Sequence, residues 1–483
     1  MDARTAVTSI GTQVPGLPLV ALGLWISWNL VAFTGGCWFD ETADTWRVFE
    51  LANIHLAASV ATLLVLFFAS EKASTFIERP ASVLAGGAAA SVGAVLICLT
   101  SPSLFHNHYA FILGCVLAGA GTTFLFVRSA AWLGALPPRT AFMRICQSAM
   151  VGAAGYAMLL LAPAGIDKVL FCLLPLIAGL LSALHVYDRA EKHMLEPNGH
   201  PTAGYRNFLI AVFVFSLAAQ YLKGGVYPLS RAESHIAFSV STLLICAVAA
   251  SSFLVCAASS KQFGFGKIYR PATLVIVALL VLMPTLQPIT GAETGAAVSI
   301  AAQYTFNLMV WGMAAYLVFQ VRGRALRVFC STNAALSLGS IAGNFVTSFA
   351  ASGSISTEGF AILSLIIALA AVTVAAFVFP EQKLEDMLLP VDETAFEKTI
   401  AATDRFAPWK AACSAIAEEH GLSERETEVF TLLARGKTNQ QVADMLIISP
   451  YTVRAHTRNI YAKLDVHSRG ELSDLVSNRV KSA

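Results

Sequence analysis

The sequence predicts an all-α protein in two parts: a polytopic membrane helix bundle of twelve spans, arranged as six plus six, and a small soluble domain of four helices. Three observations predict this fold. The 483 residues are 56% hydrophobic and only 13% charged, whereas soluble domains carry about 25% charged residues. Long apolar runs recur throughout residues 1–380. Three helix-capping sequences then follow within 423–471, a soluble segment.

Twelve runs are long and apolar enough to cross a bilayer, which takes about 20 residues of helix. The longest loop between them, 188–206, follows the sixth run, so the membrane domain (1–380) divides into two halves of six. The runs lie at 16–36, 49–70, 80–100, 108–127, 141–163, 168–187, 207–227, 236–258, 270–289, 296–319, 331–351 and 357–379.

The distribution of basic residues predicts the orientation, because Lys and Arg are enriched in cytoplasmic loops. With both chain ends in the cytoplasm, fourteen Lys and Arg fall in inner loops, and the outer loops hold only Arg47, Lys168, Lys223 and Arg231. We therefore expect a multi-pass protein of the inner (cytoplasmic) membrane with both termini cytoplasmic. The lipid bilayer is its first expected partner.

This pattern of twelve spans around a long central cytoplasmic loop resembles the major facilitator superfamily. In that fold two helix bundles rock around a cavity at the membrane midplane. The family has a glycine-and-arginine signature between the second and third spans, where this sequence reads SEKASTFIERP instead. The resemblance implies the fold, while this departure puts active transport in doubt.

Polar side chains at span depth indicate where a ligand cavity would lie. Gln303, Asn307 and Trp311 recur at four-residue spacing on one face of the tenth run. The predicted cavity is Asn29, Glu50, Asn53, Gln303, Tyr304, Asn307 and Trp311, and further candidates are Trp28, His55, Gln220, Tyr221 and Asn344. The alternative for each residue is a helix cap or a hydrogen bond between helices.

The C-terminal residues predict an acidic cytoplasmic linker, 381–407, and a folded domain, 408–483. A short helix ends at Gly421, and four more helices follow. Ser423-x-x-Glu426, Thr438-x-x-Gln441 and Ser468-x-x-Glu471 are capping boxes, in which two side chains satisfy the first free amides of a helix. Ser449 caps the remaining helix, with Pro450 at its first position.

The helix after Ser449 has two faces. Val453, His456, Ile460 and Leu464 recur at three-four-four spacing and predict a packed stripe that includes the histidine, while Tyr451, Arg454, Ala455, Arg458 and Ala462 lie opposite. A tight helix pair that exposes such a face is typical of a helix-turn-helix, whose second helix enters the DNA major groove. The alternative is a solvated basic face.

The stretch LSERETEVFTLLARGKTNQQVADMLIISPYTVRAHTRNIYAKLDVHSRGEL looks like the DNA-binding domain of bacterial LuxR-type (FixJ/GerE-like) transcription regulators. The shared features are RE-x-EV, LLARGKTN, IS-x-x-TVR-x-H, NI-x-x-KL and Arg469. The resemblance implies that Arg454, Ala455 and Arg458 read bases. It implies phosphate contacts from Lys437, Thr438, Thr452 and Lys463.

A helix-turn-helix of this size reads one half-site, so we expect a homodimer on double-stranded promoter DNA. Leu472 and Leu475 of the last helix are the predicted dimer contacts, and Arg469 is predicted to pair with Glu426. RNA polymerase is a further expected partner.

Together these features predict a membrane-anchored one-component transcription regulator whose membrane domain senses an unknown small molecule. The alternatives are a major-facilitator-like transporter with a regulatory DNA-binding tail, and a passive anchor for a constitutive DNA-binding domain. We expect neither an enzyme nor a cofactor. The nine cysteines are scattered singly without metal-ligand spacing, so we predict no metal site and no disulfide framework.

Overall fold

The structure is a computed structural model that describes residues 16–34, 45–77, 79–100, 107–163, 165–185, 204–224, 231–258, 274–279, 281–282, 291–321, 325–349, 357–378, 409, 412–434, 437–446 and 449–482. Within these ranges the regular structure is helical and contains no strand, as the sequence predicts. The chain divides into two compact units, Met1–Val391 and Asp392–Ala483. The predicted linker, 381–407, lies outside the described residues.

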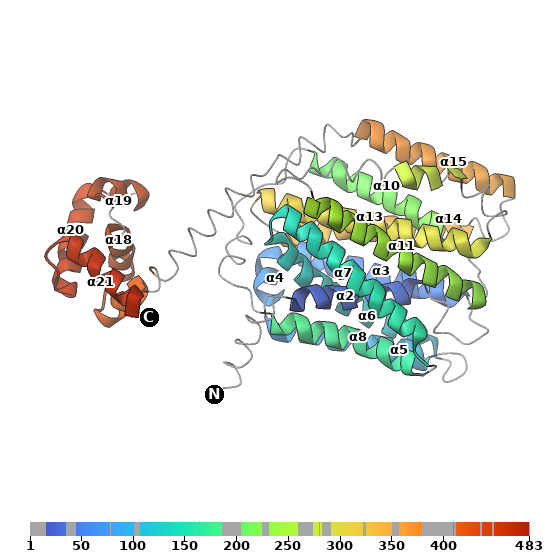
Figure 1. Cartoon of the computed structure of the whole chain (residues 1–483), viewed down its shortest axis with the longest axis horizontal. Helices are drawn as coiled ribbons and strands as arrows, with labels where there is room; N and C mark the ends of the chain where they lie inside the picture. The colour runs from blue at the N-terminus through green and yellow to red at the C-terminus, as the bar shows by residue number, and fades with distance from the viewer. Residues whose placement is uncertain are drawn as a thin grey trace. The chain divides into compact units, whose positions relative to one another are not determined.

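The first half of the membrane unit contains six long helices (Figure 1). Five of them begin or end within a few residues of the predicted runs, and α6 extends seven residues further, to Gly134. The six are α2 (Leu17–Thr34), α3 (Thr45–Phe68), α5 (Pro80–Leu99), α6 (His108–Gly134), α7 (Pro138–Leu161) and α8 (Ile166–Leu184). A short helix, α4 (Ser70–Ile77), occupies the predicted loop between the second and third spans.

The second half follows the same pattern. Its helices are α10 (Tyr205–Gly224), α11 (Arg231–Ala258), α13 (Ala292–Val321), α14 (Ala325–Phe349) and α15 (Thr357–Thr373), which continues as a π-helical turn (Val374–Val378). The ninth predicted run is described only at 274–279 and 281–282, where it is helical. Eight helices among the described residues are long and apolar enough to cross a membrane, and Leu17–Phe33 is a shorter apolar helix.

Glycines allow the closest helix contacts in the bundle. A Cβ placed on Gly121 of α6 would lie 2.4 Å from the carbonyl oxygen of Gly86 on α5, and one on Gly339 of α14 would lie 2.3 Å from that of Phe213 on α10. Small residues are what lets membrane helices pack closely. Any larger residue at these positions would force α5 from α6, or α10 from α14.

The two halves meet through α3 against α14 and through α7 against α11. At the end of the bundle where α7 and α14 begin, two arginines bridge the halves. Arg139 of α7 donates to the carbonyl oxygens of Cys256 and Ala257 at the end of α11, at 2.9 and 2.8 Å. Arg327 of α14 donates to Ser70 Oγ at 2.7 Å. These bonds join the halves at this end.

The C-terminal unit has its own apolar core, formed by helix 412–419 and four further helices. The four are α18 (Glu424–Ala434), α19 (Asn439–Leu446), α20 (Pro450–Leu464) and α21 (Arg469–Ser482). Their starts confirm the predicted capping residues: Ser423, Thr438 and Ser468 each accept the amide three residues on, at 3.2–3.3 Å. Gly421 ends the preceding helix with φ +60°.

Candidate functional sites

The second helix of the pair α19 and α20 presents two faces. Val453, Ile460 and Leu464 of α20 are buried in the core of the unit, and α20 packs against both α18 and α19. The opposite face is exposed and consists of Tyr451, Arg454, Ala455, Arg458 and Ala462. His456 is only half-buried, so the predicted stripe is packed at its three aliphatic positions and incompletely at the histidine.

The start of α20 is fixed by its cap. Ser449 Oγ accepts the amide of Thr452 at 3.0 Å and lies 2.7 Å from Thr452 Oγ1. Thr452 and Lys437 are half-buried and Thr438 is exposed. The amide of Thr438 is already occupied, since it donates to Gln441 Oε1 at 3.0 Å. These three residues, which are predicted to contact phosphate, therefore keep partly or fully exposed side chains.

The fourth, Lys463, keeps 39% of its side chain exposed, but its ammonium is engaged by other groups of the unit. Its Nζ donates to Glu426 Oε2 at 2.7 Å and to the carbonyl oxygen of Gly421 at 3.0 Å. The bond from Lys463, followed by that from the Ser423 amide, lowers the pKa of Glu426 to about 2. The predicted pair of Arg469 with Glu426 is wrong, because the Arg469 guanidinium donates instead to Asn439 Oδ1 at 2.6 Å.

One predicted dimer contact is also corrected. Leu472 is fully buried in the core of its own unit and offers no surface to a second copy. Leu475 is half-buried against the same core. The exposed face of α21 carries Glu471, Asp474 and Asn478. Sequence periodicity cannot separate a core leucine from an interface leucine in so short a helix.

The membrane unit contains a cavity of about 800 Å³, including the part open to solvent. Helices of both halves line it: α2, α3 and α6 from the first, and α10, α13 and α14 from the second. Of the predicted cavity residues, Asn29, Gln303, Tyr304, Asn307 and Trp311 line it. Glu50 and Asn53 do not: Glu50 precedes the first lining residue of α3, Ala52, and the side chain of Asn53 is bonded to Asn344 instead.

A chain of side-chain amides runs beside this cavity. Gln303 Nε2 donates to Gln220 Oε1 at 2.5 Å, and Gln220 Nε2 donates to Asn344 Oδ1 at 2.6 Å. Asn344 Nδ2 then donates to Asn53 Oδ1 at 3.0 Å. Of these four residues only Asn53 belongs to the first half, so the final hydrogen bond joins the two halves. The interhelical hydrogen bond was the alternative interpretation of these residues.

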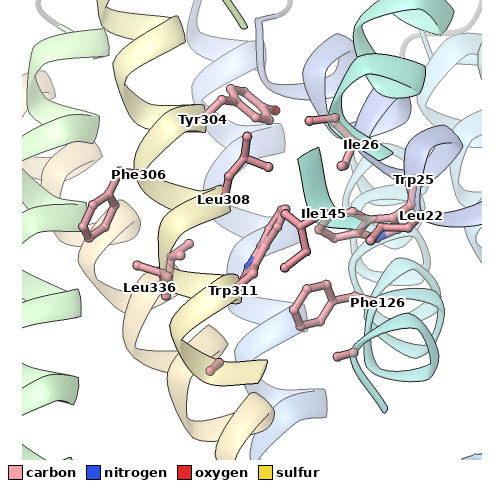
Figure 2. Packing of buried hydrophobic residues seen from close by; sticks show 14 of the residues in the cluster. Leu22, Trp25, Ile26, Phe126, Ile145, Tyr304, Phe306, Leu308, Trp311 and Leu336 are labelled. Atoms are coloured by element: carbon pink, nitrogen blue, oxygen red, sulfur yellow. The ribbon is translucent and has the colours of Figure 1, made fainter. Parts of the chain in front are cut away.

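Aromatic rings form the deeper wall of the cavity. Trp25 lies 5.5 Å from Trp311 and 5.1 Å from Phe126, measured between ring centres. Figure 2 shows Tyr304, Leu308 and Trp311 on one side of α13, turned toward the helices that carry Trp25 and Phe126. The four-residue spacing of the tenth run therefore predicts the cavity-facing side of α13 correctly.

Lys223 is the cavity residue that sequence reasoning misplaced. The loop-charge count puts it outside the membrane, but it lies in the last turn of α10, is 4% exposed and lines the cavity. Its position three residues after Gln220 was an available signal, because that spacing puts both residues on one helix face. Thr122, Asn333 and Ser340 are further lining residues that the sequence did not indicate.

The C-terminal geometry agrees with comparisons to known proteins. Residues 420–476 match the family "Bacterial regulatory proteins, luxR family", so this segment is a LuxR-family helix-turn-helix domain. The response regulatory protein YgeK of Escherichia coli K12, described as uncharacterized, is 46% identical over 59 residues, 12% of this chain and 40% of YgeK. LiaR of Bacillus subtilis 168, a transcriptional regulatory protein, is 46% identical over 48 residues, 10% of this chain and 23% of LiaR. The chain thus spans less than half the length of these relatives.

The membrane unit is similar to solved transporters. FucP, a major facilitator superfamily transporter in the outward conformation, aligns with 75% of this chain and 97% of its own at 12% identity and a TM-score of 0.52. The proton:xylose symporter XylE aligns with 79% of this chain and 100% of its own at 11% identity and a TM-score of 0.51. At these identities the likeness shows the fold alone. With its apolar helices, the chain is a multi-pass membrane protein with a major-facilitator-like fold.

Proposed function

We propose that this chain is a membrane-anchored, one-component transcription regulator that binds promoter DNA through α20. The observation that carries the proposal is the exposed face of α20, where Arg454 and Arg458 flank Ala455 within a LuxR-family domain. Arginine can donate two hydrogen bonds to guanine O6 and N7, and a small residue lets the helix approach the base edges. Lys437, Thr438 and Thr452 then contact phosphates, which position the domain on the duplex.

Lys463 is left out of this proposed DNA surface. Its ammonium is engaged by Glu426 and Gly421, so a phosphate contact would have to compete with two short hydrogen bonds. We assign it a structural role instead. Binding as a homodimer remains part of the proposal, with the exposed face of α21 around Asp474 in place of the buried Leu472. RNA polymerase is the further partner proposed for the DNA-bound dimer.

The membrane unit serves as the sensor in this proposal. The distribution of basic residues supports an inner-membrane protein with both termini in the cytoplasm, where the C-terminal unit meets DNA. The cavity is shared between the halves, so a ligand that binds one arrangement of the halves more tightly shifts the population toward that arrangement. Rocking of the halves then changes how two C-terminal units pair on DNA.

The test of DNA recognition uses residues 408–483, because this segment has a core of its own. Operator fragments are selected from genomic DNA and measured by gel shift. Arg458→Ala should lose sequence-specific binding, whereas Arg479→Ala should keep it, since Arg479 pairs with Glu419 away from α20. Undiminished specific binding by Arg458→Ala overturns the proposal. Reporter expression unchanged after replacement of the membrane unit would favour a passive anchor.

A transporter with a DNA-binding tail is the second candidate. The fold and the polar cavity between the halves favour it. It predicts that sealed vesicles accumulate a solute and that Asn307→Ala abolishes this uptake. The regulator proposal predicts binding without accumulation.

A further inference from the structure

Lys223 brings a buried positive charge to the cavity. Its side chain is almost fully shielded, and its Nζ lies 5.9 Å from the centre of the Phe33 ring on α2. No Asp or Glu among the described residues lies within ion-pair distance of this ammonium. Burying a cation without a negative partner is costly in free energy, and intramembrane charges mark sites of function.

Three hydrogen-bond acceptors in the same lining also lack partners among the residues that the structure describes. They are Gln303 Oε1, Asn307 Oδ1 and His55 Nδ1, each buried. His55 Nε2 lies 3.0 Å from the Thr122 hydroxyl, which itself donates to the carbonyl oxygen of Ala118 at 2.7 Å. The histidine Nε2 must therefore be the donor, which leaves Nδ1 as an acceptor. Buried polar groups left unpaired are destabilising, so these positions suit a ligand with hydroxyl or N–H donors.

The remaining lining mixes aromatic rings with small polar side chains, such as Asn29 and Ser340. Phe33 lies beside Lys223, and Trp25, Phe126 and Trp311 form the cluster deeper in the bundle. A cavity that combines aromatic walls with a few convergent polar groups is typical of small-molecule sites. The charge and the acceptors specify the ends of a ligand, and the rings accommodate its body.

We propose that this cavity binds a small organic anion, whose negative group pairs with Lys223 and whose donors reach the acceptors on His55, Gln303 and Asn307. The apolar body of the anion packs against the aromatic walls. The inference rests on the proposed sensor function and deepens it, because it names the chemical class of the ligand. A membrane lipid phosphate is the other source of negative charge, and the experiments separate the two.

The first experiment needs no ligand. The full chain is purified in dodecyl maltoside, which carries no phosphate, and its thermal unfolding midpoint is measured. Lys223→Met should raise the midpoint, because it removes a buried charge that has no carboxylate partner in the described part of the chain. Lys168→Met, at a half-buried lysine of α8 outside the cavity lining, should leave it unchanged. A midpoint lowered by Lys223→Met overturns the proposal, since it means that the lysine already has a stabilising partner.

The second experiment measures binding to the same protein. Benzoate, 4-hydroxybenzoate and 3-phenylpropanoate are each compared with the corresponding primary amide by calorimetric titration. At least one carboxylate should bind about tenfold more tightly than its amide, the scale expected for a charge-assisted hydrogen bond. Lys223→Met should abolish this preference. No preference for any carboxylate overturns the proposal.

A third arm addresses the lipid. Phosphatidylglycerol is added to the detergent-purified chain, and it should shift the midpoints of wild type and Lys223→Met equally. A midpoint shift confined to the wild type identifies a lipid phosphate as the partner of Lys223 and overturns the proposal of an organic anion. DNA binding by residues 408–483 is measured separately, so failure of the cavity proposal and failure of the regulator proposal are distinguishable.

Discussion

The Nζ atom of Lys463 on α20 lies 2.7 Å from Oε2 of Glu426 on α18, and only 7% of the Glu426 side chain is exposed. The carboxylate also accepts the amide of Ser423, so one residue both caps α18 and anchors α20. This contact sets the position of α20 relative to the remainder of its unit. It makes Lys463 a stabilising residue, and that role can be separated from DNA binding.

Replacing Lys463 with Met should destabilise the C-terminal unit by about 1–3 kcal/mol, because Glu426 would remain buried without its cation. Urea unfolding of residues 408–483, followed by circular dichroism, measures the change. Lys437→Met is the matched control, and it should leave the unfolding midpoint nearly unchanged. If Lys463→Met instead keeps full stability but weakens DNA binding, the lysine contacts phosphate after all.

Acid should destabilise the same unit through Glu426. The pKa of this carboxyl is about 2 in the folded state, against 4.5 for an unperturbed glutamate. Because the folded pKa is lowered, the stabilisation is fully present above pH 4.5 and is lost as the pH falls from 4.5 toward about 2. Urea midpoints across this interval should fall more steeply for wild type than for Glu426→Gln. Parallel curves for the two proteins would show that another group dominates.

Lys437 and Arg454 should affect DNA binding differently. Lys437→Ala should weaken binding to all sequences alike and reduce the slope of log affinity against log salt by about one, because one phosphate contact is lost. Arg454→Ala should instead weaken binding to the operator selectively and reduce the ratio of operator affinity to random-DNA affinity. Fluorescence anisotropy at four salt concentrations distinguishes the two effects. Equal selectivity losses in both variants would contradict the assigned roles.

The amide chain of the membrane unit should contribute to its stability. Gln220→Leu leaves Gln303 without its acceptor and Asn344 without its donor, and each orphaned buried group costs about 1–3 kcal/mol. The thermal midpoint of the purified chain should therefore fall. Gln147→Leu is the control, since Gln147 accepts a hydrogen bond from Arg144 on its own helix. Equal midpoints for both variants would show that the amide hydrogen bonds of Gln220 add no stability.

Features that depend on residues close together in the sequence could be predicted, whereas features that depend on contacts between distant residues could not. Helix caps depend on residues three apart, so Ser423, Thr438 and Ser449 were identifiable directly, and the apolar runs predicted the described membrane helices. The partners of Glu426 and the burial of Leu472 depend on residues far along the chain. Lys223 was misplaced for a related reason: basic residues at the end of an apolar run are counted as loop residues, whereas its depth is decided by packing of α10 against α14 and α13.

The two arginines that bridge the halves should control access to one end of the bundle. Arg139 donates to the carbonyl oxygens of Cys256 and Ala257, so the end of α11 is held against the start of α7. Cys256 is fully buried there. Arg139→Ala removes two charge-assisted hydrogen bonds, and the free energy of local opening should fall enough to raise the labelling rate of Cys256 about tenfold.

Labelling of the full chain with a polar maleimide, followed by mass spectrometry of the cysteine peptides, measures this rate. Arg144→Ala is the matched control, because Arg144 lies on the same helix but donates to Gln147 within it. Cys115, buried where α6 packs, should stay unreactive in both variants. If Arg139→Ala leaves Cys256 protected, these bonds do not hold the end closed. An anion that rocks the halves through Lys223 should then change the Cys256 labelling rate in wild type and leave it unchanged in Lys223→Met.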